Sequence, residues 1–259
     1  MTTKAKTDTT APSFRERLRE ILISQEGVLL VIMAITVLFL ATQSEQFLTV
    51  DNLLNQGRFL TEVGLVAIPM TYIIITGGID LSVGSIFGLS VTMIGYLWDT
   101  AGLPLAVAIV LALVISCIAG FINGWFIVRL DVPPLIMTLA TLALYRGIAQ
   151  GISESQRVSG FPDWFLELGQ ANVLGVPAQL WILLIAIIIS AIILARTTFG
   201  RSLYAMGHNE VAARFSGLPV DRYKLIIYTF SGFMSGLAGY IFPSRVSTSR
   251  SDFGNALEL

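Results

Sequence analysis

Long apolar runs alternate with short polar segments along most of the chain. A helix needs ~20 mainly apolar residues to cross the hydrocarbon core of a bilayer, and each run supplies all or most of them. The runs lie at about residues 28–41, 60–75, 79–97, 103–128, 135–148, 180–194 and 225–242. The pattern therefore predicts an all-α fold, a polytopic transmembrane helical bundle with about seven spans.

Composition agrees with this prediction and excludes other classes. The 259 residues are 54% hydrophobic and only 13% charged, which is too little polar surface to cover a soluble globule of this size. The formal net charge of −1 excludes an electrostatic nucleic-acid binder, which needs a basic face. The single cysteine, Cys117, lies in an apolar run and is expected to be a small buried hydrophobic residue.

The sequence divides into an N-terminal arm, residues 1–27, and a transmembrane domain, residues 28–259. Ser13 and Glu16 form a capping-box pattern, followed by apolar residues on one helical face and charged residues opposite. The arm is thus expected to be cytoplasmic and to carry an amphipathic helix on the membrane surface. A simple polar lead-in to the first span fits the pattern equally well.

The distribution of basic residues predicts the orientation. With the N-terminus in the cytoplasm and the spans alternating, 11 of the 16 lysines and arginines fall on the cytoplasmic side. This places residues 196–224 in the cytoplasm. It places residues 153–179, with aromatic side chains suited to a membrane interface, on the outer side.

Residues 196–224 form the longest charged segment between two strongly apolar ones. Asn209 is expected to cap a short helix, Glu210 to lie in its first turn, and Gly217 with Pro219 to end it just after Ser216. A connection between two spans needs only a few turn residues, so this capped helix predicts a docking surface for a partner. Its candidate residues are Asn209, Glu210, Ala212, Ala213, Arg214, Ser216 and Gly217.

A second polar motif interrupts the apolar sequence at residues 76–85. Adjacent glycines let the backbone leave helical geometry, which persists at membrane depth only where protein or water satisfies it. Two interpretations are open: a tight turn at the cytoplasmic surface with Asp80 as an N-cap, or a substrate or ion site at a broken helix. The candidate residues of the translocation path are Gly77, Gly78, Asp80, Ser82 and Asn123.

Three spans carry a Gly-x-x-x-Gly spacing, which brings small residues onto one helical face and marks close contacts between helices in lipid. The helix-packing residues predicted in this way are Gly84, Gly88, Gly120, Gly124, Gly232 and Gly236.

Other polar residues indicate no catalytic or metal site. Glu62 and Arg146 lie near outer ends of spans, so interfacial anchoring is favoured over a transport relay. His208 stands in a loop with no second His or Cys near it. No phosphate-binding P-loop and no nucleophile–base pattern occurs. The chain is thus expected not to be an enzyme, and any ATP that drives it must bind to another chain.

Four motifs together resemble the permease subunits of bacterial ABC sugar importers of the ribose, xylose, rhamnose and autoinducer-2 kind. The motifs are ITGGIDLSVGS at 75–85, GFING at 120–124, PPLIMTL at 133–139, and FGRSLYAMGHN with AARFSGL between 199 and 218. The resemblance covers nearly everything after the first span, in order. Family members usually continue well past the position equivalent to Leu259, so the chain is expected to be either truncated at its C-terminus or unusually short.

The resemblance implies a multi-pass subunit of the bacterial inner membrane. Its expected partners are a second permease copy or homologue, two cytoplasmic ATP-binding subunits and a periplasmic sugar-binding protein. No cofactor is expected on this chain, with ATP and Mg²⁺ bound by the partner ATPase, and the helix from Asn209 to Ser216 matches the place of the ATPase-coupling helix. The rival hypotheses are an ion-coupled secondary transporter that uses Asp80 and a non-transporting membrane scaffold.

Overall fold

The computed structural model describes residues 24–153 and 157–254. Its contacts divide the chain into two units, Met1–Leu53 and Leu54–Leu259. The predicted amphipathic helix of the N-terminal arm lies outside the described residues. The described part of the first unit contains α2 (Gln25–Gln43), whose first turn is capped by Ser24.

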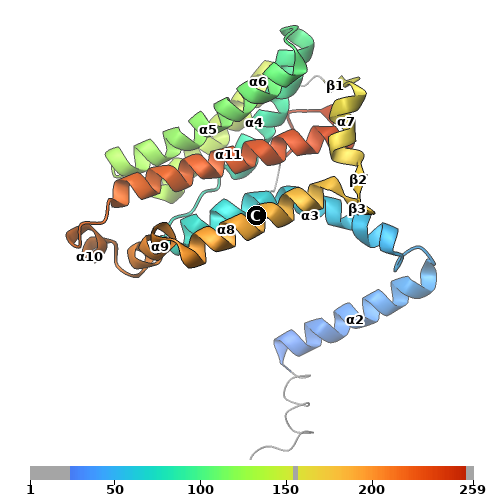
Figure 1. Cartoon of the computed structure of the whole chain (residues 1–259), viewed down its shortest axis with the longest axis horizontal. Helices are drawn as coiled ribbons and strands as arrows, with labels where there is room; N and C mark the ends of the chain where they lie inside the picture. The colour runs from blue at the N-terminus through green and yellow to red at the C-terminus, as the bar shows by residue number, and fades with distance from the viewer. Residues whose placement is uncertain (1–23, 154–156, 255–259) are drawn as a thin grey trace, which may run out of the picture. The chain divides into compact units, whose positions relative to one another are not determined.

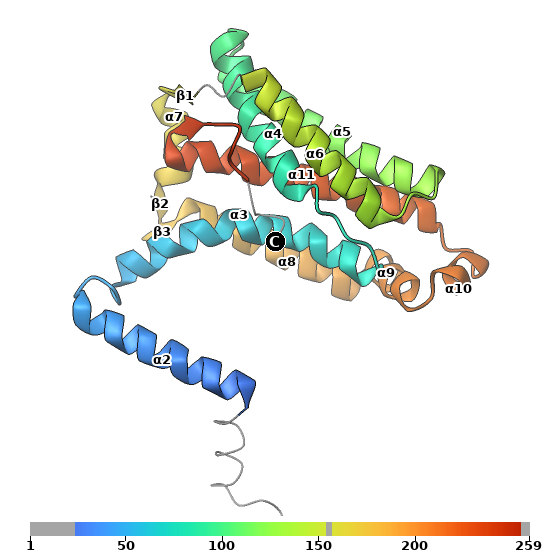
Figure 2. The same cartoon turned by 180° about the vertical axis from the view of Figure 1, so that it is seen from behind.

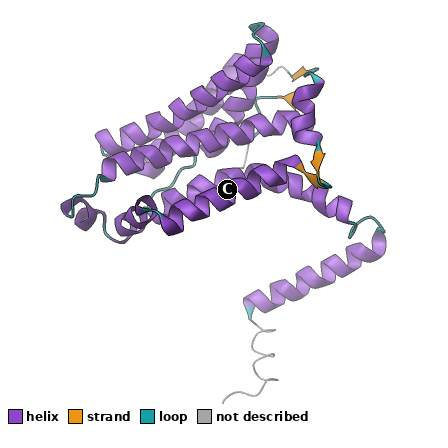
Figure 3. Cartoon of the chain, in the orientation of Figure 1, coloured by secondary structure: helices purple, strands orange, loops and turns teal. Residues whose placement is uncertain are grey.

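Helices account for most of the described residues (Figure 3), and six of them are long and apolar enough to cross a membrane. These six helices are α2, α3 (Val50–Ile75), α5 (Leu105–Arg129), α6 (Pro134–Ser153), α8 (Ala178–Arg196) and α11 (Val220–Val246). The helical membrane fold predicted from the sequence is therefore confirmed. The described residues thus contain one candidate span fewer than the seven expected, because the apolar run at 79–97 forms a shorter helix.

The run at 79–97 forms a short interior helix, α4 (Val83–Gly95), followed by the π-helical turn η1 (Tyr96–Thr100). Thirteen residues rise only about 20 Å, less than the ~30 Å of the hydrocarbon core. Every residue of α4 is buried, and the helix packs on α5, α6 and α11. A helix that is apolar on all sides suits a protein interior as well as lipid, so hydropathy could not separate the two.

Short elements gather at the two ends of the Leu54–Leu259 unit (Figure 1). One end carries α7 (Asp163–Gln170) and two antiparallel pairs, β1 (Val158–Ser159) with β4 (Thr248–Ser249) and β2 (Asn172–Val173) with β3 (Val176–Pro177). The other end carries α9 (Thr198–His208) and α10 (Glu210–Phe215). We refer to them as the α7 end and the α10 end.

The helix pair α5–α11 forms the centre of this unit and depends on glycine. A Cβ added at Gly120 would lie 2.3 Å from the carbonyl oxygen of Tyr228 and 2.9 Å from the Cα of Gly232. Gly124 likewise faces Leu225 and Tyr228, and a Cβ at Gly236 would lie 2.7 Å from the Ser116 hydroxyl. These four glycines therefore lie where α5 and α11 approach closely, because only a residue without a side chain leaves room for such an approach.

In the remaining glycine pair, Gly88 faces the turn near the end of the described chain. A Cβ at Gly88 would lie 2.5 Å from the carbonyl oxygen of Phe253. One at Gly254 would lie 2.4 Å from the carbonyl oxygen of Gly84. At Gly88 the close neighbour is thus a turn and not the helix that the spacing led us to expect, because any backbone can use the space that a glycine leaves.

A second helix pair, α3 and α8, lies alongside this core (Figure 2). Gly57 and Gly64 of α3 face Leu180 and Leu183 of α8, and the Tyr72 hydroxyl donates a hydrogen bond of 2.8 Å to the carbonyl oxygen of Ser190. The segment between α3 and α4 leaves the end of α3 beside α9 and runs into the bundle (Figure 2). There α4 begins partway along the length of the bundle.

Candidate functional site

The capped helix expected in the charged segment is present as α10. The side chain of Asn209 accepts a hydrogen bond of 2.9 Å from the backbone N–H of Ala212, which is the N-cap interaction predicted. Glu210 lies in the first turn. The helix ends at Phe215, followed by Gly217 with φ of 82°, a left-handed conformation that favours glycine.

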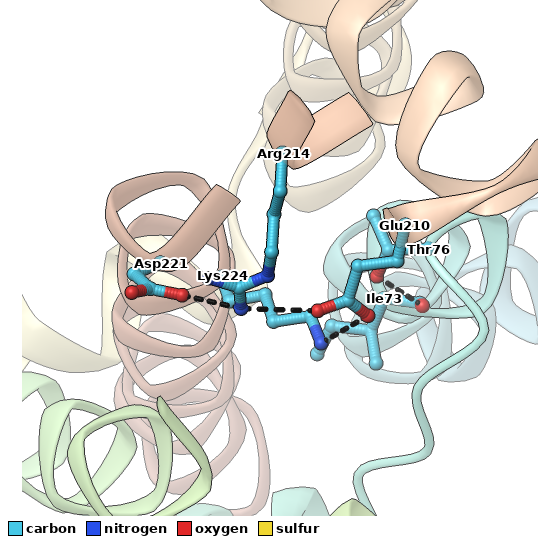
Figure 4. Close-up of polar contacts among 6 residues, drawn as sticks. All are labelled: Ile73, Thr76, Glu210, Arg214, Asp221 and Lys224. Carbon is cyan, nitrogen blue, oxygen red and sulfur yellow. Dashed lines mark hydrogen bonds and ion pairs between the residues drawn. The ribbon is translucent and has the colours of Figure 1, made fainter. Parts of the chain in front are cut away.

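Four charged side chains fasten α10 to the first turns of α11 (Figure 4). Glu210 accepts hydrogen bonds from Lys224 at 2.6 Å and from Arg214 at 3.1 Å, and Arg214 also pairs with Asp221 at 2.5 Å. Partial burial alone would raise the pKa of the Glu210 carboxyl, but the hydrogen bonds and positive charges of Lys224 and Arg214 outweigh it and hold the pKa below its ordinary value. The charged residues of α10 therefore bind within the chain.

Two large apolar side chains of α10 are more exposed than its charged ones. Phe215 is 89% exposed and Val211 is 63% exposed, and the four-residue spacing places them on one helical face. Sequence reasoning selected Glu210 and Arg214 from this helix and missed Val211 and Phe215. The available signal was a pair of large apolar residues four apart in a segment where solvent would favour polar ones.

The neighbouring helix α9 connects α10 to the C-terminal end of α3. A Cβ at Gly207 would lie 1.8 Å from the carbonyl oxygen of Ile75, the last residue of α3. At that point the helix ends, with Thr76 donating a hydrogen bond of 2.8 Å to the carbonyl oxygen of Ile73 (Figure 4). His208, at the end of α9, is exposed. Within the described ranges, no group of three or more His, Cys, Asp or Glu side chains is placed to hold a metal ion.

The broken segment between α3 and α4 leads to a fully buried carboxylate. Asp80 is 0% exposed, and its oxygens accept hydrogen bonds from the Ser82 backbone N–H at 3.0 Å, the Ser82 hydroxyl at 2.6 Å and the Ser231 hydroxyl at 2.8 Å. Asn123 of α5 donates to the Ser82 hydroxyl at 2.7 Å. We call Asp80, Ser82, Asn123 and Ser231 the Asp80 cluster.

The cluster corrects one of the two interpretations of Asp80. The carboxylate does cap a backbone N–H just before α4, but it lies inside the protein and not in a turn at the surface. The residues that flank the break also fit it: Gly77 has φ of 76°, and a Cβ at Gly78 would lie 2.8 Å from the Tyr228 hydroxyl. Participation of these residues in a translocation path stays a prediction.

Of the cluster, the sequence identified Asp80, Ser82 and Asn123 but not Ser231, which lies 151 residues after Asp80. The Asn123 side-chain oxygen is buried and has no hydrogen-bond partner in the described part of the chain. The cluster thus joins the broken segment to α5 and α11 through side chains alone.

Glu62, expected to be an interfacial anchor, is instead buried at 3% exposure and paired with Arg245 of α11 at 2.9 Å. The expectation was wrong because hydropathy along one helix cannot reveal a partner that is supplied 183 residues later.

Comparison with known proteins places these features in a family. A family model described as the permease component of a branched-chain amino acid transport system matches residues 52–259. The chain belongs to this permease family.

Three relatives of the chain are named as import permeases for ribose or autoinducer 2. The ribose import permease of Haemophilus influenzae is 34% identical over 92% of this chain and 74% of its own length. The autoinducer 2 import system permease of Yersinia enterocolitica is 34% identical over 82% of this chain and 65% of its own length. That of Photorhabdus luminescens is 32% identical over 88% and 70%. No solved structure matches the chain.

Proposed function

We propose that the chain is the membrane-spanning permease subunit of an ATP-binding cassette importer for a monosaccharide or a similar hydroxylated solute. Support comes from the permease family and from relatives named as importers of ribose and autoinducer 2. The observation that carries the proposal is the outward apolar pair of α10, Val211 and Phe215, on a helix whose charges are bound within the chain. An apolar pair on one face of a short helix suits docking into a groove of a protein partner.

In this proposal the ATPase subunits bind at the α10 end, in the cytoplasm, and a periplasmic sugar-binding protein delivers the solute at the α7 end. The subunit lies in the bacterial inner membrane with its N-terminus in the cytoplasm and pairs with a second permease copy or homologue. ATP and Mg²⁺ belong to the ATPase, and this chain contributes no catalytic group of its own.

Movement of α10 would be transmitted to the segment between α3 and α4 by two routes, one through α11 and one through α9. Lys224 and Asp221 connect α10 directly to α11, while α9 meets the end of α3 at Gly207. The chain passes from α3 into the segment that carries Asp80, which is bonded to Ser231 of α11. ATP-driven movement can shift the path only if α10 contacts the two ATPase states unequally.

The test compares Phe215→Asp with Leu174→Asp, because both side chains are 89% exposed and Leu174 lies at the α7 end. With the candidate ATPase and binding protein in proteoliposomes, Phe215→Asp should abolish ATPase association and uptake, while Leu174→Asp should retain association with the ATPase. Normal uptake by Phe215→Asp would overturn the docking role. Uptake that ignores ATP removal but collapses with an ionophore would favour the ion-coupled carrier.

For the translocation path, Asp80→Asn separates charge from shape. The amide keeps an oxygen for the Ser82 N–H, so a purely structural cap tolerates the change. A role for the carboxylate in the path predicts reduced uptake with unchanged insertion and unchanged association with the ATPase.

A further inference from the structure

The α7 end contains a buried ion pair between two of the candidate membrane spans. Glu62 belongs to α3 and Arg245 to the last turn of α11, and their side chains are 4% and 12% exposed. The Arg245 Nε donates to the Glu62 carboxylate at 2.9 Å. A charge in this position is costly unless it is paired, so the two side chains hold each other in place.

Aromatic rings from both helices enclose the guanidinium. The Arg245 Cζ lies 4.4 Å from the ring centroid of Phe59 on α3 and 5.1 Å from that of Phe242 on α11. Both distances lie within the range of cation–π attraction. The arginine therefore makes two kinds of contact with α3, one through its charge to Glu62 and one through its face to Phe59.

The backbone around Arg245 is fixed from a third side by α7. A Cβ at Gly169 would lie 2.5 Å from the backbone nitrogen of Arg245, and Gln170 donates a hydrogen bond of 3.3 Å to the Arg245 carbonyl oxygen. The end of α11 is thus held by α7, which also holds α3, because Arg58 donates hydrogen bonds of 3.1 Å to the carbonyl oxygens of Gly169 and Gln170. The Arg245 side chain adds the direct contact between α11 and α3.

On α3 the neighbouring position is also polar and closed off from solvent. Thr61 is 0% exposed, and its hydroxyl has no hydrogen-bond partner among the described residues. Thr61 lies on the face of α3 that Gly57 and Gly64 turn toward α8. Val66, four residues after Glu62, lies instead on the face toward α11, is 4% exposed and packs in one core cluster with Ile241.

We propose that Glu62 and Arg245 form a latch that closes the outer end of the solute path between α3 and α11 and that releases during each transport cycle. This deepens the proposed importer function and rests on it. The ATPase moves the α10 end, and the Glu62–Arg245 pair at the α7 end must separate before the path opens there. Glu62 and Arg245 are positioning residues: they act on access and need not touch the solute.

The test uses a reporter cysteine, Val66→Cys, in a Cys117→Ser background of the full chain, assembled with its ATPase and binding protein in right-side-out vesicles. In the closed state a membrane-impermeant thiol reagent should label the reporter slowly. Glu62→Gln keeps the shape and removes the charge, and it should raise the labelling rate about tenfold or more. The charge exchange Glu62→Arg with Arg245→Glu should restore slow labelling.

Arg250→Gln is the matched control, because Arg250 pairs at 2.7 Å with Asp252 two residues away and connects no helices. It should leave the labelling rate unchanged. Equal labelling of the wild-type pair and Glu62→Gln would overturn the latch, and so would equal acceleration by the control.

A second labelling measurement needs no disruptive variant and tests the proposal even if Glu62→Gln fails to fold. With the Glu62–Arg245 pair intact, the Val66→Cys reporter should label faster during ATP turnover than without ATP. An unchanged rate in a complex that transports its solute would overturn the latch while leaving the importer function in place. Absence of ATP-dependent uptake would instead contradict the proposed function itself.

Discussion

Ion pairs attach a helix to each end of α11, and the two ends differ in burial. At the α7 end, Glu62 and Arg245 are 4% and 12% exposed. At the α10 end, the side chains of Glu210, Arg214 and Asp221 are 34%, 44% and 50% exposed, and only Lys224, at 18%, is largely covered. Coulomb attraction is screened at the exposed end and not at the buried one, so the same chemistry gives a firm closure at one end and an adjustable attachment at the other.

The largest expected effect comes from breaking the buried pair on one side only. Glu62→Ala leaves the Arg245 charge buried without a partner, which should cost about 3–5 kcal/mol of stability. Replacing both residues, Glu62→Leu with Arg245→Leu, removes the charge altogether and should cost much less. Thermal unfolding of the purified subunit measures both, and a single change no worse than the double would contradict the burial argument.

A smaller effect is expected where backbone, not charge, connects the α10 end. Gly207→Ala would place a Cβ 1.8 Å from the carbonyl oxygen of Ile75, and relief of this overlap should cost about 1–3 kcal/mol. Gly147→Ala in α6 is the matched control, because nothing lies within 4 Å of its Cβ. Unfolding midpoints should fall for the first variant only. Equal midpoints would mean that α9 does not pack closely against α3 at Gly207.

Breaking the exposed cluster should matter less still. Glu210→Gln should cost about 0.2–1 kcal/mol, and added salt should shrink the difference because the side chains are reached by solvent. The stability loss of Glu62→Gln should persist at high salt. Unfolding of both variants at low and high ionic strength makes the comparison directly, and a salt-independent Glu210→Gln would contradict it.

The pH dependence follows from the lowered pKa of Glu210. A carboxyl whose pKa is lowered by folding stabilises the protein above its ordinary value of 4.5, and this contribution is lost as the pH falls through the folded pKa below 4.5. The stability difference between wild type and Glu210→Gln should thus be constant from neutral pH down to about 5 and vanish in stronger acid. A difference that disappears near neutral pH would show that the Lys224 contact is not maintained.

The sequence predicted the local features of this molecule well. Asn209 caps α10, Gly217 adopts the left-handed conformation that ends it, and Gly120 and Gly232 pack α5 on α11, because each depends on residue type within a few positions. The features that failed depend on distant partners. Glu62 could not be paired with Arg245, nor Asp80 with Ser231, from spacing alone.

Burial of α4 failed for a different reason. Its thirteen residues are as apolar as a membrane span, and only the packing of α5, α6 and α11 around them reveals that protein covers them on every side. The exposure of Phe215 could not be predicted from the sequence for the same reason. It is evident only once the structure shows that the charged neighbour Arg214 is bonded to α11.

The most direct test of the account is protection of Phe215 by the ATPase. A Phe215→Cys reporter in a Cys117→Ser background should react with an impermeant thiol reagent from the cytoplasmic side of the membrane, and bound ATPase should slow the reaction about tenfold or more. Labelling from the opposite side, or at the same rate with and without the ATPase, would contradict the claim that α10 is the helix on which the motor acts.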